Sequence, residues 1–207
     1  MSSFTYETTD RTTPLETYEW DNVWLEHADN RNAKRILYIG DSISCRTRHH
    51  ATAAMNETVL FDGFGTSKAV DNPYFKPALQ LFAAQQGTRR AIIFNNGLHG
   101  WHLSDEGEYA TYYEDMVTFL MEEFRNTPLY LVLTTTLKDE ERAIRVTVRN
   151  TVVRAIAAKY NLPLIDLHSA SQRAFSLLAA DGVHFTEEGY AVLAQEIMNT
   201  LPRELFT

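Results

Sequence analysis

The feature that most restricts the fold is an alternation of short apolar runs with segments of helical spacing. Apolar runs of strand length occupy residues 35–39, 58–61, 91–94, 129–133 and 162–165. Between the later runs, apolar residues recur every three or four positions, at Tyr113, Val117, Leu120 and Phe124 and then at Ile144, Val148, Val152 and Ala155. Because parallel strands need a crossover, usually a helix, this order predicts a three-layer α/β/α sandwich around a central, mainly parallel five-stranded sheet.

The two ends of the chain are expected to differ. A closing helix is predicted over residues 187–201, with Leu193, Ile197 and Leu201 on its buried side. Residues 1–33 are polar and are expected to form an N-terminal appendage that packs on a core domain spanning 34–207. A short helix is possible over 15–27, which would place Trp20 and Trp24 on one face, where we expect them to pack against the core.

Composition narrows the class of function. The 207 residues are 44% hydrophobic and 22% charged, which suits one globular core. A formal net charge of −8 disfavours nucleic acid and anionic membranes as partners, and no run of Lys or Arg predicts a local basic groove. No apolar run reaches the roughly 18 residues of a membrane-spanning helix. The single Cys45 and a start without the features of a secretory signal predict a cytoplasmic location.

A candidate nucleophile follows the first predicted strand, in the sequence Gly40-Asp41-Ser42. In open α/β sheets, ligands bind outside the carboxyl ends of the strands, so a side chain at this strand-to-helix turn is well placed for chemistry. The amide of Ser42 would lie at a helix N-terminus, where negative charge is stabilised. Taken alone, a serine here is more often a helix cap, and the Gly-x-Ser-x-Gly pattern of α/β-hydrolases is broken because Ser44 occupies the second glycine position.

A candidate base lies before the closing helix, in Asp181-Gly-Val-His184. A serine hydroxyl is a weak nucleophile and needs a base, which in turn needs a group that orients it. A spacing of three through a glycine turn can bring the carboxylate to Nδ1 of His184 and leave Nε2 free for a proton. Taken alone, Asp-x-x-His is more typical of a solvated helix entrance.

The two signals together resemble the SGNH/GDSL hydrolase family, over about residues 34–200. The resemblance implies a flavodoxin-like fold and a catalytic triad in which Ser42 is the nucleophile, His184 the base and acid, and Asp181 the group that orients His184. It also implies an oxyanion hole formed by the amide of Ser42, a glycine after the second strand and an asparagine after the third. Gly65 fits the glycine position, in a loop after the predicted strand at 58–61.

The third oxyanion position departs from the family pattern. If Gly97 is the glycine of that block, His99 replaces the usual asparagine, and Asn96 is the alternative donor if the loop shifts. Further candidate substrate-binding residues border the same edge, although each also has a purely structural interpretation: Asp41, Trp101, His102 and Thr135.

The resulting hypothesis is a serine esterase that hydrolyses a small acyl ester, with a carbohydrate O-acetyl ester as one substrate class that the resemblance implies. No cofactor is required, and the spacing of the histidines and the single cysteine predicts no metal site. The alternatives are a non-catalytic ligand-binding or interaction protein on the same scaffold, and an acyltransferase or thioesterase. The expected partner is a small-molecule ester, and the sequence predicts no oligomeric state.

Overall fold

The central feature of the fold is a six-stranded sheet in the order β1-β3-β2-β4-β5-β6. A computed structural model describes residues 15, 18–85, 87–103 and 105–206. The strands are β1 (Asp21–Trp24), β2 (Lys34–Gly40), β3 (Val59–Thr66), β4 (Ala91–Phe94), β5 (Leu129–Val132) and β6 (Leu164–Ile165). The helices are α1 (Ser42–Ala54), α2 (Phe75–Ala83), α3 (Glu106–Glu123), α4 (Glu140–Tyr160), α5 (Leu167–Arg173) and α6 (Glu187–Thr200), with short 3₁₀ turns at Phe175–Leu177 and Arg203–Leu205.

The mainly parallel α/β architecture is confirmed, with one correction. Strands β2 to β6 are the five predicted strands and run parallel. The sixth, β1, pairs antiparallel with β3, with Asp21 opposite Thr66. The helix considered over residues 15–27 is therefore wrong for Asp21–Trp24. Without β1, strand β3 would leave a row of backbone donors and acceptors unpaired at the sheet edge, and an added strand satisfies them.

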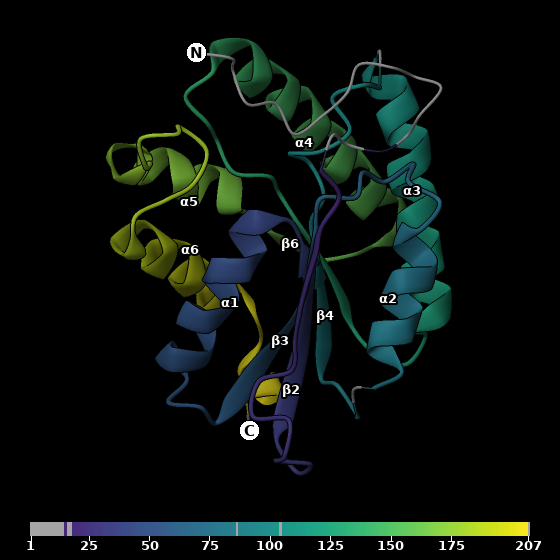
Figure 1. Ribbon diagram of the computed structural model, residues 1–207, viewed down its shortest axis with the longest axis vertical. Helices are drawn as coiled ribbons and strands as arrows, with labels where there is room; N and C mark the ends of the chain where they lie inside the picture. The colour runs from purple at the N-terminus through teal and green to yellow at the C-terminus, as the bar shows by residue number, and fades with distance from the viewer. Residues whose placement is uncertain (1–14, 16–17, 86, 104, 207) are drawn as a thin grey trace.

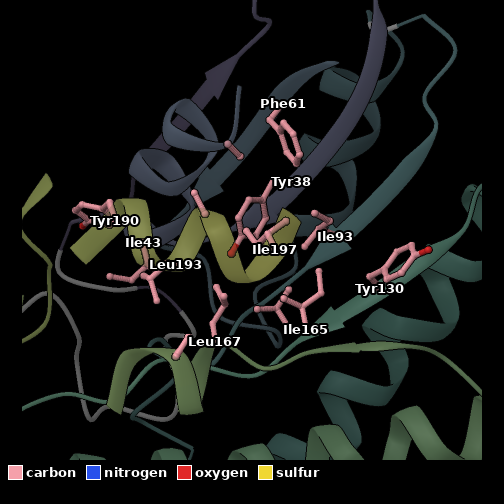
Figure 2. Packing of buried hydrophobic residues seen from close by; sticks show 14 of the residues in the cluster. Tyr38, Ile43, Phe61, Ile93, Tyr130, Ile165, Leu167, Tyr190, Leu193 and Ile197 are labelled. Atoms are coloured by element: carbon pink, nitrogen blue, oxygen red, sulfur yellow. The ribbon is translucent and has the colours of Figure 1, made fainter. Parts of the chain in front are cut away.

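The sheet is covered by helices on both faces. Helices α1, α5 and α6 lie on one side and α2 and α3 on the other (Figure 1). Helix α4 buries Val153, Ile156 and Ala157 in the same core as α2 and α3. Because side chains alternate along a strand, Tyr38 of β2 packs with the first group, and its neighbours Leu37 and Ile39 pack with the second. Figure 2 shows the first core, in which Leu193 and Ile197 of α6 lie beside sheet residues. Their burial, and that of Leu201, confirms the face predicted for the closing helix.

Helix α4 is present, but the apolar residues whose spacing predicted it are not all buried. Ile144 is 67% exposed and Val148 is 44% exposed. The helix instead buries a face that includes Val146, Arg149 and Val153. An arginine in the buried stripe disrupts the hydrophobic pattern, so apolar spacing alone selects the neighbouring face.

The strand order changes direction at one boundary in the sheet. From β2 the chain first continues to β3 on one side and later returns to β4 on the other, so the strand order reverses at the β2/β4 boundary. In open α/β sheets such a boundary leaves a crevice at the carboxyl ends of the strands. No helix in the described ranges is both long and apolar enough to cross a membrane.

Candidate active site

The turn from β2 into α1 presents Ser42 at the carboxyl edge of the sheet. Asp41 has extended backbone and caps the helix, its Oδ1 accepting a hydrogen bond from the amide of Ile43 at 2.9 Å. The hydroxyl of Ser44 donates to the carbonyl of Asp41 at 2.7 Å and fixes the same turn. Ser42 is the first residue of α1, so its amide has no partner within the helix.

Ser42, His184 and Asp181 form a continuous hydrogen-bonded chain. The Oγ of Ser42 lies 2.8 Å from Nε2 of His184, and Nδ1 of the same ring lies 2.8 Å from Oδ2 of Asp181. Because an ionised carboxylate can only accept, Nδ1 carries the proton and Nε2 is left to accept from the serine hydroxyl. The structure thus brings together all three side chains selected from the sequence, although Ser42 and His184 are 142 residues apart in the chain.

The turn that carries Asp181 and His184 is held by hydrogen bonds that involve its backbone amides and carbonyls. Oδ1 of Asp181 accepts from the amides of Val183 and His184, each at 2.9 Å. Gly182 has φ +74°, a left-handed conformation that favours glycine, and its carbonyl accepts from the amide of Lys138 at 2.8 Å. The Asp-x-x-His spacing works because this turn directs the second carboxylate oxygen toward the imidazole.

These contacts keep Asp181 ionised. Partial burial of the carboxyl group would raise its pKa, but hydrogen bonds from Val183 and His184 outweigh that effect and lower the pKa of Asp181 to about 2. The side chains of His184 and Asp181 remain 40% and 53% exposed, respectively, so a solvent molecule or substrate can reach the imidazole.

The 97–103 loop is held by two arginines that the sequence analysis missed. Arg149, fully buried on α4, donates to the carbonyls of Gly97, His99 and Gly100 at 3.1, 2.6 and 2.8 Å. One turn earlier, Arg145 donates to backbone carbonyls farther along the same loop. The guanidinium groups of Arg145 and Arg149 also pair with the carboxylate of Glu106, the first residue of α3, at 2.6 and 2.8 Å. The i, i+4 spacing of Arg145 and Arg149 can be read from the sequence and places both on one face of a helix. The loop that this face contacts can be identified only in the structure.

His99 and His184 approach the crevice from different loops. The burial of Asp41 raises the pKa of its carboxyl, while the imidazoles of His99 and His184 oppose that shift electrostatically. Both rings therefore lie within electrostatic range of the residue directly before Ser42. His99 also contacts Trp20, with ring centroids 6.4 Å apart in an edge-to-face arrangement.

The alternative donor Asn96 is used elsewhere. Its side-chain amide donates to the carbonyl of Lys68 at 2.8 Å, and its backbone carbonyl accepts from the hydroxyl of Tyr109 at 2.6 Å. Asn96 is completely buried. The first contact links the loops after β3 and β4, and the second links Asn96 to α3.

Gly65 lies inside β3, not in a loop after it, because the strand extends to Thr66. The amide of Ser67 donates to the carbonyl of Trp20 at 3.1 Å. In an antiparallel ladder, hydrogen-bonded pairs recur every second residue, so Gly65 and its partner Asn22 form the next such pair. The amide of Gly65 consequently faces β1, away from Ser42. A glycine is needed there for packing, since a Cβ would lie 2.2 Å from Sγ of Cys45.

The four expected substrate-binding residues are mostly engaged within the protein. Asp41 is 1% exposed and caps α1, and Thr135 is also buried. His102 is buried, with Nε2 2.7 Å from Oδ2 of Asp71. Trp101 is half-buried, and its ring is covered by the guanidinium of Arg149 at 4.5 Å. Because these side chains have little surface left for a substrate, none of them is proposed to bind one.

Comparisons with known proteins identify the fold. No family model matches the chain, and no curated protein matches it. A solved member of the lipolytic G-D-S-L family from Veillonella parvula aligns with a TM-score of 0.67 at 21% identity, covering 82% of this chain and 98% of that one. An aryl esterase from M. smegmatis aligns at 0.63 and 17% identity, covering 82% and 100%. An acetyl xylan esterase aligns at 0.63 and 15%, covering 81% and 100%. The chain has the fold that these three solved proteins share.

Proposed function

We propose that this protein is a serine esterase of the SGNH/GDSL type, which hydrolyses a carboxylic ester through an acyl-enzyme. The observation that carries the proposal is the hydrogen-bonded chain from Ser42 through His184 to Asp181, at the carboxyl edge of the sheet. The fold shared with solved GDSL-type esterases supports the same reaction class.

The chemistry would proceed in two similar halves. Oγ of Ser42 attacks the ester carbonyl while Nε2 of His184 removes the hydroxyl proton. The tetrahedral intermediate collapses, His184 returns the proton to the departing alkoxide, and the acyl group stays on Ser42 as an ester. Water, deprotonated by His184, then attacks that ester and releases the carboxylic acid. Asp181 stays ionised throughout and stabilises the imidazolium that forms in each half.

The developing oxyanion would be stabilised by two groups. The amide of Ser42 lies at the N-terminus of the 13-residue helix α1, where partial positive charge favours an anion. The imidazole of His99 would supply the second donor, in the position where the SGNH family carries an asparagine. Its backbone is fixed by Arg149, so the ring is held by a rigid loop.

The substrate class we propose is a small acyl ester, with a carbohydrate O-acetyl ester as the first to test. Its support is the alignment with acetyl xylan esterases, one of them from Geobacillus stearothermophilus with a TM-score of 0.58. An alcohol acceptor in place of water would make the same acyl-enzyme a transferase, and product analysis distinguishes the two.

The direct test is active-site labelling with a fluorophosphonate, together with hydrolysis of p-nitrophenyl acetate and acetylated sugars. The wild type should be labelled, Ser42→Ala and His184→Ala should not, and Ser176→Ala, at an exposed serine on a 3₁₀ turn, should behave as wild type. A folded wild type that neither reacts with the probe nor hydrolyses any of these esters would contradict the proposal and favour a ligand-binding protein.

A further inference from the structure

A second candidate binding site lies at the opposite end of the sheet from Ser42. A cavity of about 620 Å³ is formed by the loop between β1 and β2, the start of β2 and the segment that leads into β4. Lys34, which lines it, is the first residue of β2, and Arg90 directly precedes β4. This cavity is therefore at the amino ends of the parallel strands, whereas Ser42 follows the carboxyl end of β2.

The wall of the cavity is preorganised by one buried arginine. Arg35 donates to the carbonyls of Glu26, His27 and Asn30 at 2.8, 2.9 and 3.0 Å, and it pairs with Asp62 at 2.8 Å. These bonds fold the β1–β2 loop back onto the sheet. Because its charge is neutralised by Asp62, Arg35 acts as a structural anchor and leaves ligand contacts to its neighbours.

Three other cations that line the cavity have no carboxylate partner within the described part of the chain. Arg31 and Arg90 are exposed and make no side-chain ion pair or hydrogen bond with any described residue. Nζ of Lys34 donates to the carbonyl of Phe206, at 3.2 Å. No Asp or Glu is among the described residues that line the cavity. Like charges around one cavity repel one another, and a bound anion would relieve that repulsion.

We propose that this cavity binds a small polyanion that carries two or more phosphate groups. Arginine guanidinium groups bind phosphate oxygens with two parallel hydrogen bonds, and lysine adds a point charge. Asn32, Gln85 and Thr88 also line the cavity and can donate further hydrogen bonds. The cavity volume lies within the range of about 300–1,000 Å³ for small-molecule sites. A cavity of this size suits a chain of phosphate groups better than a single phosphate. The inference is independent of the esterase chemistry.

The test is calorimetric titration of the full chain with inorganic triphosphate at low ionic strength. The wild type should bind, and Arg31→Gln/Arg90→Gln should reduce the affinity at least about tenfold, because removing a charge-assisted hydrogen bond costs about 1.4 kcal/mol or more. Single orthophosphate should bind more weakly than triphosphate, and added salt should weaken the wild-type affinity.

The matched control removes the same two charges elsewhere. Arg154→Gln/Arg173→Gln changes two exposed arginines, on α4 and α5, that pair with Asp166 and Glu196. This variant should keep the wild-type affinity for triphosphate, and a thermal melt of each variant checks that it is folded. Failure of the folded wild type to bind triphosphate at low salt would overturn the proposal, as would an equal reduction of affinity in both double variants.

Discussion

The two ends of the sheet are built in opposite ways. At the carboxyl end, each side chain of the Ser42–His184–Asp181 chain has a hydrogen-bond partner, and the backbone turns that carry them are themselves capped. At the amino end, Arg31 and Arg90 line a cavity with no partner in the described part of the chain. The first arrangement is complete within the protein and suits a reaction. The second is charged and unsatisfied, which suits the binding of an external anion.

After loss of Ser42 or His184 themselves, the largest expected effect at the carboxyl end follows Asp181→Asn. The amide cannot stabilise an imidazolium and favours the wrong tautomer of His184, so kcat for p-nitrophenyl acetate should fall by about 10³–10⁴, as for the matching change in serine proteases. Steady-state kinetics measure the change. The same variant should bind triphosphate like the wild type, and weaker binding would break the proposed independence of the two ends.

A smaller effect is expected for His99→Ala. If the ring donates to the oxyanion, kcat should fall by about 10²–10³ with little change in KM, because the hydrogen bond forms mainly in the transition state. His99→Asn, which restores the family's usual donor, should recover part of the activity. A rise in KM at unchanged kcat would assign His99 to substrate positioning instead.

Arg149→Lys should act through His99. Lysine keeps the charge but cannot reach three loop carbonyls at once, so a misplaced loop should lower kcat by up to about 10²-fold. The informative measurement is a double-mutant cycle. In the His99→Ala background the Arg149→Lys change should cost no further kcat, whereas additive effects would indicate a general structural role.

The smallest expected effect is on stability in acid. The folded-state pKa of Asp181, about 2, is below the unfolded value of about 3.9, so this group adds stability above the unfolded pKa and loses it as pH falls toward the folded one. Denaturant unfolding of wild type and Asp181→Asn should therefore differ most at neutral pH and converge near pH 2. Since the carboxyl group is half exposed, the difference should be modest. A gap that widened in acid would contradict the assigned cause.

Much of the site at the carboxyl ends of the strands was predictable, because it depends on short sequence patterns and on how parallel strands pair. The helix N-terminus at Ser42 and the glycine turn between Asp181 and His184 follow from short sequence patterns, and parallel strands necessarily bring their carboxyl ends together. The oxyanion positions were less predictable. Assigning Gly65 to a loop depended on where β3 ends, and that end is set by pairing with β1, a segment interpreted as helix.

Charged residues in the core also limited what could be predicted from the sequence. The apolar residues that predicted α4 include the exposed Ile144 and Val148, whereas the helix buries Arg149, whose charge is satisfied by backbone carbonyls and one carboxylate. A buried ion pair of this kind has no apolar signature, so periodicity alone cannot detect it.

The sequence by itself determined the strand and helix order and the mainly parallel sheet, since these depend on local periodicity and crossover geometry. Its resemblance to the SGNH/GDSL family selected the three side chains that meet at the carboxyl edge. Only the tertiary structure decided the direction of the Gly65 amide, the arginines that hold the His99 loop, and the gathering of Arg31, Lys34 and Arg90 around one cavity. These depend on contacts between segments far apart in the chain. Such contacts have no spacing rule, because the fold brings their residues together only after the sheet has formed.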